Sequence, residues 1–329
     1  MFAGARRESG LPQHDEPVTA VLPPGRLVAG LQLPVQSQST IYIEPWETTA
    51  TAADLARVAQ AADRSGFWYV GVCDHVAIPR SRAEAMGTEW WDTVATLGWL
   101  AGITEHVRLL SHITVPAYRH PLLTAKAWST LDVVSGGRMI LGVGAGHLEQ
   151  EFAALGVDFD RRGALLDEAI DALRACFADE FPEVDGRTWS FRDMGARPRP
   201  VQAGGPPIWV GGSSRPARRR AAERADGWLP QGPTTPELIA ELRHDREAAG
   251  RDERFDIGAL AGAFYVGEPG WDVGPCLTGP SEKLAHVLGK LRGMGVGQVQ
   301  VRLRSRSCAE LVEQVEAFGT QVIPLLGQA

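Results

Sequence analysis

An Asp-His pair is the first place in this sequence where acid–base chemistry is indicated. Asp74 and His75 follow residues 67–72, an apolar run typical of a buried strand, with only Cys73 between them. The pKa of a histidine is readily tuned near neutrality, so a histidine at the end of a strand can act as a general acid or base. The alternative is structural, with Asp74 capping a helix and His75 packed beside it. Position alone leaves both interpretations open.

Two glycine-rich turns could hold an anion. One covers residues 142–147 (Gly-Val-Gly-Ala-Gly-His) at the end of a predicted strand, and a helix is expected to begin near Leu148. The other covers residues 211–214 (Gly-Gly-Ser-Ser), and Pro216 then opens a helix. Glycine lets a ligand approach the backbone closely, and free N–H groups at a helix start favour an anion. Such turns also occur without any ligand, but two of them on neighbouring strands favour one shared phosphate.

Three further side chains near these features are candidates. Trp90 and Trp91 follow the second predicted strand, where they line an apolar substrate slot or simply pack into the core. Arg215 lies in the first turn of the helix that Pro216 opens, within reach of an anionic ligand. The arginines that follow it, 218–220, include residues expected on a solvated outer face.

The elements that position these residues alternate between strand and helix. Helices are predicted from Pro121 to about 135 and over 215–224, 236–249, 281–293 and 308–319, and a Pro/Gly-rich insertion at 178–206 contains a hairpin near 189–191. The eight predicted strands are 27–33, 67–72, 107–115, 139–143, 208–211, 227–229, 257–266 and 298–303. Eight strands, each followed by a helix, predict an α/β fold of the (β/α)₈ TIM-barrel class. A doubly wound open sheet is the competitor, but the first strand lacks the glycine fingerprint of a dinucleotide fold.

Length, net charge and cysteine content limit the classes of function that this chain can have. The chain has 329 residues, which we divide into a flexible N-terminal extension (1–25) and one barrel domain (26–329). The net charge of −7 argues against nucleic acid as a partner. Four scattered cysteines predict neither a metal site nor disulfides, which favours a cytoplasmic protein with reduced thiols. The sequence contains no run of about 18 apolar residues, so it predicts no membrane span.

In combination, several stretches resemble one known family. They are residues 72–75, 108–121, 125–138, 141–147, 151–156, 207–213 and 225–228. In this order they resemble the luciferase-like monooxygenase superfamily, and more closely its branch of coenzyme F420-dependent oxidoreductases. The similarity spans about residues 27–305.

The resemblance implies a barrel with an insertion between strands four and five and a flavin-like ring across the barrel mouth. It also implies that the two glycine turns hold the cofactor phosphate and that a non-proline cis peptide lies within residues 111–113. The residues implied to bind the cofactor are Ser111, His112, Ile113, Gly144, Ala145, Gly146, His147, Gly211, Gly212 and Ser213. In sugar-phosphate dehydrogenases of this branch, a carboxylate follows the fourth-strand glycines. Here His147 stands there, which argues against sugar-phosphate oxidation.

The resulting hypothesis is an oxidoreductase that transfers a hydride between reduced coenzyme F420 and a small organic substrate. His75 is the expected proton donor, Asp74 orients it or shapes the loop, and His147 borders both phosphate and substrate. One alternative is an FMN-dependent monooxygenase of the same fold, and another is a barrel that binds flavin without turnover. The sequence leaves the substrate open. It also leaves open the oligomeric state, although relatives are often homodimers.

Overall fold

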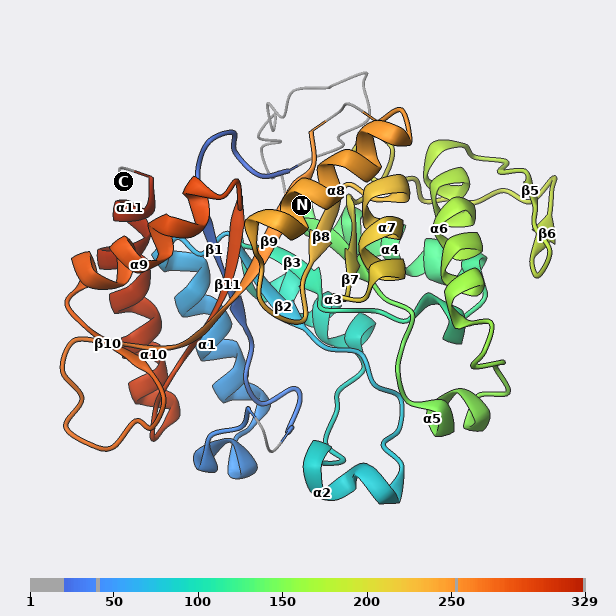
Figure 1. The fold of residues 1–329 in the computed structure, drawn as a ribbon. Coiled ribbons are helices and arrows are strands. Elements are labelled where there is room, and N and C mark those ends of the chain that lie inside the picture. Colours follow the sequence, from blue (N-terminus) through green and yellow to red (C-terminus); the bar gives the residue numbers. More distant parts are fainter. Residues whose placement is uncertain (1–20, 40–41, 252–253, 328–329) are drawn as a thin grey trace, which may run out of the picture.

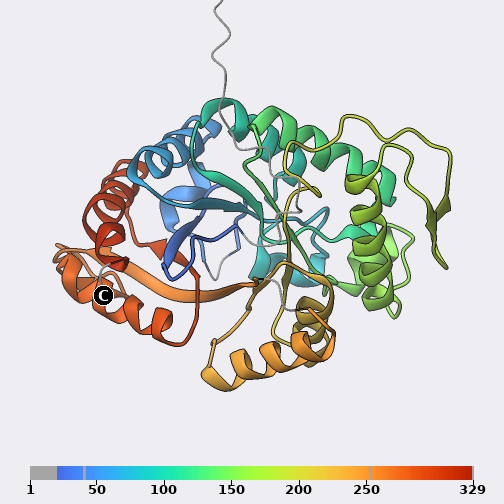
Figure 2. The same ribbon diagram turned by 90° about the horizontal axis from the view of Figure 1, so that it is seen from above.

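Eight parallel strands close into a barrel in the computed structural model of the chain, which describes residues 21–39, 42–251 and 254–327. The barrel strands are β1 (Val28–Gln32), β2 (Tyr69–Val72), β3 (Arg108–Ser111), β4 (Met139–Val143), β7 (Ile208–Gly211), β8 (Gly227–Leu229), β9 (Asp256–Val266) and β11 (Gln298–Leu303). They pair in that order, and β9 pairs with β11 and β11 with β1 to close the ring (Figure 2). The predicted (β/α)₈ class is confirmed.

Helices surround the barrel because parallel strands need long crossover connections (Figures 1 and 2). They are α1 (Ala52–Ser65), α3 (Thr93–Ile103), α4 (Pro121–Ser135), α6 (Arg162–Ala178), α7 (Arg215–Arg224), α8 (Pro236–Ala248), α9 (Ser281–Gly293) and α10 (Cys308–Ala317). The short helices α2 (Ala83–Met86) and α5 (Glu149–Ala154) lie at one end of the barrel, and α11 (Ile323–Leu326) ends the described chain. None of the helices in the described ranges is long and apolar enough to cross a membrane.

The predicted insertion lies between β4 and β7. It contains a hairpin of β5 (Val184–Asp185) and β6 (Ser190–Phe191), which projects from the barrel beside α6 (Figure 1). The hairpin near residue 189 is thus confirmed. A short strand, β10 (Leu277–Gly279), was not predicted; it pairs with β9 outside the ring.

Side chains alternate between the barrel interior and the layer under the helices. Val299 and Val301 are fully buried in the core beneath the helices. Gln298 faces inward, where its Oε1 accepts a 2.7 Å hydrogen bond from Tyr69 Oη. The Tyr69 ring fills the space beside Gly30, where a Cβ would lie 2.0 Å from the ring. The lower barrel is therefore packed, which leaves the opposite, carboxyl end of the strands for ligands.

The chain before β1 covers the amino end of the barrel. The N–H groups of Val21 and Leu22 donate to the Asp256 carboxylate at 2.9 and 3.4 Å, and Trp209 Nε1 donates to it at 3.2 Å. Burial raises the pKa of Asp256 to about 6 against the hydrogen bonds that lower it. Of the predicted extension, residues 1–20 lie outside the described residues, and residues 21–25 include this contact.

Candidate active site at the carboxyl ends of the strands

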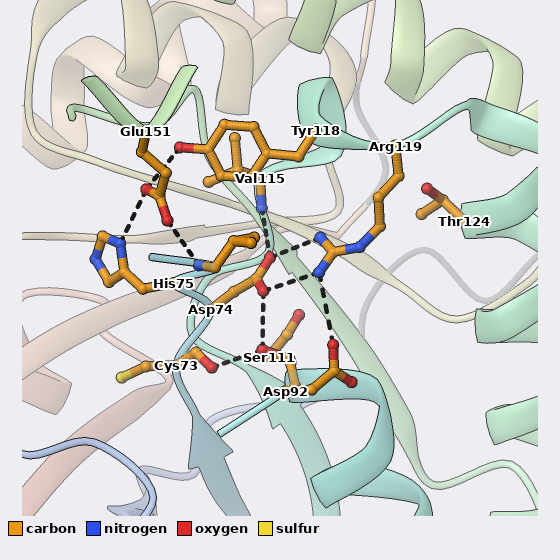
Figure 3. Close-up of polar contacts among 12 residues, drawn as sticks. Cys73, Asp74, His75, Asp92, Ser111, Val115, Tyr118, Arg119, Thr124 and Glu151 are labelled. Atoms are coloured by element: carbon orange, nitrogen blue, oxygen red, sulfur yellow. Dashed lines mark hydrogen bonds and ion pairs between the residues drawn. The ribbon is translucent and has the colours of Figure 1, made fainter. Parts of the chain in front are cut away.

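Asp74 ties together three segments at the carboxyl end of β2 (Figure 3). Asp74 as a whole is 5% exposed, and its carboxylate accepts two hydrogen bonds from the Arg119 guanidinium, at 3.1 and 3.2 Å. It also accepts bonds from the Thr93 hydroxyl and the Val115 N–H, both at 3.1 Å. Asp74 therefore fixes the loop after β3 and the start of α3 against β2, an arrangement compatible with the predicted loop-shaping role.

Glu151, on α5, is the carboxylate that faces His75. Glu151 Oε2 lies 3.1 Å from His75 Nδ1 and accepts a 2.9 Å bond from the Tyr118 hydroxyl. Its other oxygen accepts the N–H groups of Val76 and Ala77 at 2.6 and 3.1 Å. Burial opposes ionisation, but the bonds from His75, Ala77 and Tyr118 prevail and lower the pKa of Glu151 to about 2. In Figure 3, His75 and Tyr118 approach this carboxylate from opposite sides.

Aromatic rings complete the surroundings of His75. The Trp90 ring lies edge-on with centroids 4.5 Å apart, and the His147 ring lies edge-on at 5.5 Å. His147 is exposed at the mouth. The protein around its ring still removes part of its hydration, and this partial burial together with the nearby His75 lowers its pKa. The two predicted histidines are thus brought together, with Trp90 beside them. Trp91, predicted for the same slot, packs against the main core and donates to Glu89.

A neutral polar cluster forms the floor of the barrel mouth. His112 Nδ1 lies 3.2 Å from Gln32 Oε1 and 2.9 Å from Gln300 Nε2, and the two glutamines are joined at 3.0 Å. Gln32 Nε2 also donates to Cys73 Sγ at 3.0 Å. Burial lowers the pKa of His112 to about 4, so its ring is uncharged at neutral pH. The peptide bond between His112 and Ile113 is cis, within the three residues where the resemblance implied one.

The two glycine turns lie side by side because β4 and β7 are paired neighbours. The Ile113 side chain fills the space beside both, where a Cβ on Gly144 or Gly211 would lie 2.4 or 2.7 Å from it. The Gly144 and Gly212 N–H groups already donate to Thr114 and Leu229 carbonyls at 2.9 Å.

The remaining donors of these turns fit an anion such as a cofactor phosphate. Within the described ranges, no residue accepts from the N–H groups of Gly146, His147 or Ser213. The glycines add no side chains of their own to the turns, and α7, with its N-cap at Ser214, begins at the second turn. Arg218 donates to the Ser213 carbonyl and braces that turn. The arrangement is compatible with the predicted phosphate site.

One predicted anion ligand is turned away from the site. Arg215 pairs with Glu241 at 2.8 Å and with Asp245, both on α8, and is half exposed. The expectation that it reaches an anionic ligand is therefore wrong in this structure, because acidic side chains on the neighbouring helix hold its guanidinium. Ser111 is fully buried, and its hydroxyl donates to the Gly142 carbonyl, so only its backbone could face a ligand.

The sequence reasoning gave no role to Glu151, Tyr118 or Arg119. Glu151 had a signal: Leu148, Glu151 and Phe152 share the spacing of one helix face, and Leu148 and Phe152 are buried. A glutamate on a buried face needs a partner. Tyr118 ends the 3₁₀ segment Pro116–Tyr118 and Arg119 directly follows it, so neither residue had a periodic signal.

This geometry is found in a chain whose residues 32–269 match the family described as luciferase-like monooxygenase. The match covers well over half of the chain. The chain belongs to the luciferase-like monooxygenase family. Members of this family are oxidoreductases and monooxygenases that act on small molecules.

Relatives within this family differ in cofactor. The chain is 31% identical over 213 residues to an F420-dependent hydroxymycolic acid dehydrogenase of Mycobacterium tuberculosis, covering 63% of this chain and 57% of the relative. It is 30% identical over 209 residues to an FMNH₂-dependent dimethylsulfone monooxygenase of Pseudomonas putida, covering 62% and 56%. A solved structure, the coenzyme F420-dependent tetrahydromethanopterin reductase of Methanopyrus kandleri, superposes with a TM-score of 0.69 at 20% identity, covering 91% and 99%.

Proposed function

We propose that this luciferase-like protein transfers a hydride between coenzyme F420 and a small organic substrate, with His75 moving the accompanying proton. The observation that carries the proposal is the hydrogen bond between His75 and the ionised Glu151. Reduction of a carbonyl by hydride leaves an alkoxide that needs a proton, and oxidation of an alcohol needs a base for the hydroxyl. One histidine held in a fixed orientation serves either direction.

Glu151 determines which nitrogen of His75 meets the substrate. An ionised carboxylate only accepts hydrogen bonds, so His75 Nδ1 carries the hydrogen that points at Glu151. The other nitrogen, Nε2, is then left for the substrate oxygen. Neutral His75 offers a lone pair there as a base, and protonated His75 offers an N–H as an acid. Glu151 also stabilises the protonated form electrostatically, as the carboxylate partner of a catalytic histidine does in hydrolases.

The residues of the mouth are compatible with a deazaflavin. Bound F420 would supply the hydride. Gln32, His112 and Gln300 would offer uncharged donors and acceptors to the edge of its ring. Gly146, His147 and Ser213 offer N–H groups to a phosphate. Trp90 excludes water from one side of His75, which strengthens the polar contacts made there.

Separate titrations with F420 and FMN test the cofactor assignment, because relatives use either one. The full-length chain is mixed with each oxidised cofactor, and quenching of cofactor fluorescence is followed. F420 is expected to bind at least about tenfold more tightly than FMN, a difference of about 1.4 kcal/mol. Tight FMN binding without an F420 response would overturn the assignment. Binding of F420 without oxidation of its reduced form by any substrate of a broad carbonyl panel would indicate a non-catalytic barrel.

A further inference from the structure

A second charged feature lies at the barrel mouth, on the strands opposite β4 in the ring. Arg302 is near the carboxyl end of β11, beside β1. On β11, Gln298 and Gln300 point into the barrel, where they contact Tyr69 and the Gln32–His112 pair. Because side chains on a strand alternate, Arg302 continues this inward-facing row one step nearer the mouth.

Arg302 lines a small cavity that shares Gln32 with the polar floor. Its wall also includes Tyr42, Glu44, Glu47 and Ser305, with leucines of β1, β11 and α10 beside them. The Arg302 guanidinium stacks on the Tyr42 ring, with its carbon 4.7 Å from the ring centroid. Tyr42 is 58% exposed, so this side of the cavity is reached from solvent.

No described residue accepts a hydrogen bond from Arg302 or pairs with it within 4 Å, although Glu44 and Glu47 are nearby. The neighbouring carboxylates are already engaged. Glu47 accepts the N–H groups of Val35 and Glu44, both at 2.9 Å. Glu44 pairs with Arg304 at 2.7 Å. Burial lowers the pKa of Arg302, in opposition to both glutamates. A partly buried guanidinium whose donors are unused gains most from an anion that comes from outside the chain.

The size of the cavity selects among anions. Its volume is about 40 Å³. One water-sized group needs roughly 10–15 Å³ of such free space, so the cavity holds about three such groups. A carboxylate has three heavy atoms, and its two oxygens match the planar fork of arginine. A phosphate is larger and tetrahedral.

We infer that Arg302 forms a carboxylate-binding subsite at the barrel mouth, assisted by Gln32 and Tyr42. The subsite opens at the same end of the barrel as His75, and Gln32 joins it to the floor beneath the proposed ring. If the proposed function holds, the substrate is therefore a small carboxylic acid, anchored at Arg302 and reacting near His75.

Acetate binding to the cofactor-free, full-length chain tests this subsite independently of any F420 activity. Arginine Nε–H resonances are recorded by ¹⁵N NMR while sodium acetate replaces sodium chloride at constant ionic strength. A parallel series uses inorganic phosphate. The Arg302 resonance, assigned by its absence in Arg302→Lys, is expected to shift saturably with acetate and less with phosphate. The dissociation constant for acetate should rise at least about tenfold in Arg302→Gln, which loses the charge-assisted bonds.

Arg57→Gln is the charge-matched control, since Arg57 is an exposed residue of α1 with only a 3.8 Å contact to Asp54. It should leave acetate binding unchanged. An Arg302 resonance that responds to acetate no more than to chloride would overturn the subsite, and the titration itself is carried out on the wild-type chain. Stronger binding of phosphate than acetate would overturn its carboxylate selectivity. Equal loss of acetate binding in Arg57→Gln and Arg302→Gln would also overturn the subsite, because the effect would then come from the overall charge of the chain.

Discussion

His75 Nδ1 and Glu151 Oε2 lie 3.1 Å apart although 76 residues separate them in the sequence. The contact joins the loop after β2 to α5, the short helix between β4 and α6. The same carboxylate oxygen accepts the Tyr118 hydroxyl, and its partner oxygen accepts two backbone N–H groups. Glu151 is thus a fully bonded, ionised anchor that fixes one nitrogen of His75 and leaves the other for chemistry.

Glu151→Gln should slow turnover more than it weakens substrate binding. Glutamine removes the charge that holds and stabilises protonated His75, so kcat is expected to fall about 10- to 100-fold, within what proton transfer contributes. Steady-state kinetics measure kcat and KM separately, and Glu149→Gln, on the exposed side of α5, is the matched control. A change in KM alone would contradict the role.

The same anchor predicts a pH dependence of stability. The pKa of Glu151 is about 2 in the folded chain, below the ordinary value of 4.5 for a glutamate. A lowered pKa contributes stability that is present above pH 4.5 and lost as the pH falls toward 2. The difference in unfolding free energy between wild type and Glu151→Gln should therefore shrink over that range. Denaturant unfolding at several pH values measures it, and a difference independent of pH would contradict it.

Arg119→Gln should destabilise the fold, because it leaves the Asp74 carboxylate buried without its cation. Breaking such a pair costs about 3–5 kcal/mol. The double variant Asp74→Asn/Arg119→Gln should recover part of this loss, since no buried charge is then left unpaired. Arg64→Gln, at an exposed pair with Glu316, should cost less than about 1 kcal/mol. Urea unfolding compares the variants, and strictly additive losses at 74 and 119 would refute the coupling.

Asp256 predicts the opposite pH dependence at the other end of the barrel. Its pKa is raised from 3.8 to about 6, so its contribution to stability is full below pH 3.8 and is lost as the pH rises through 6. Asp256→Asn removes the titration. The unfolding free energy of wild type relative to this variant should fall by on the order of 2–3 kcal/mol between pH 4 and 7. The exposed Asp160→Asn should show no such trend.

Gly146→Ala should weaken cofactor binding. Gly146 has a φ of 79°, and a Cβ there would lie 2.7 Å from the Phe152 ring, so the turn must move. Loss of a charge-assisted bond to phosphate corresponds to about a 10- to 100-fold rise in the dissociation constant. Gly156→Ala is the control, because its φ of 69° is similar but the space around it is open. Equal cofactor affinity in both variants would contradict the phosphate site.

The barrel was largely predictable because its strands are short apolar runs with sharp ends. The bounds of β4, β7, β8 and β11 and of helices α7 and α9 agree with the sequence prediction. The third strand was predicted to reach 115 but ends at Ser111, since the hydrophobic pattern continues through the cis peptide at His112–Ile113. The local hydrophobic pattern shows which residues are apolar, but it does not show where the hydrogen-bonded pairing of two strands ends.

The candidate site was only half predictable. His75 and the glycine turns carry local signals, because residue type and position at a strand end are enough to select them. Glu151 and Arg119 act through partners 76 and 45 residues away, and no spacing rule links such positions. Arg215 showed the converse: its position favoured an anion, but acidic residues of α8 hold it. Long-range pairing of charges is decided by the packing of helices, which one sequence does not specify.

The most direct test of the proposed function is a single-turnover comparison of wild type and His75→Ala. Each protein is loaded with reduced F420 and mixed with a carbonyl substrate drawn from the panel, and the absorbance of oxidised F420 is followed. We expect wild type to oxidise the bound cofactor about 10²- to 10⁴-fold faster than the variant, at equal cofactor affinity. Equal rates in the two proteins would contradict the assignment of His75 as the proton-transfer group.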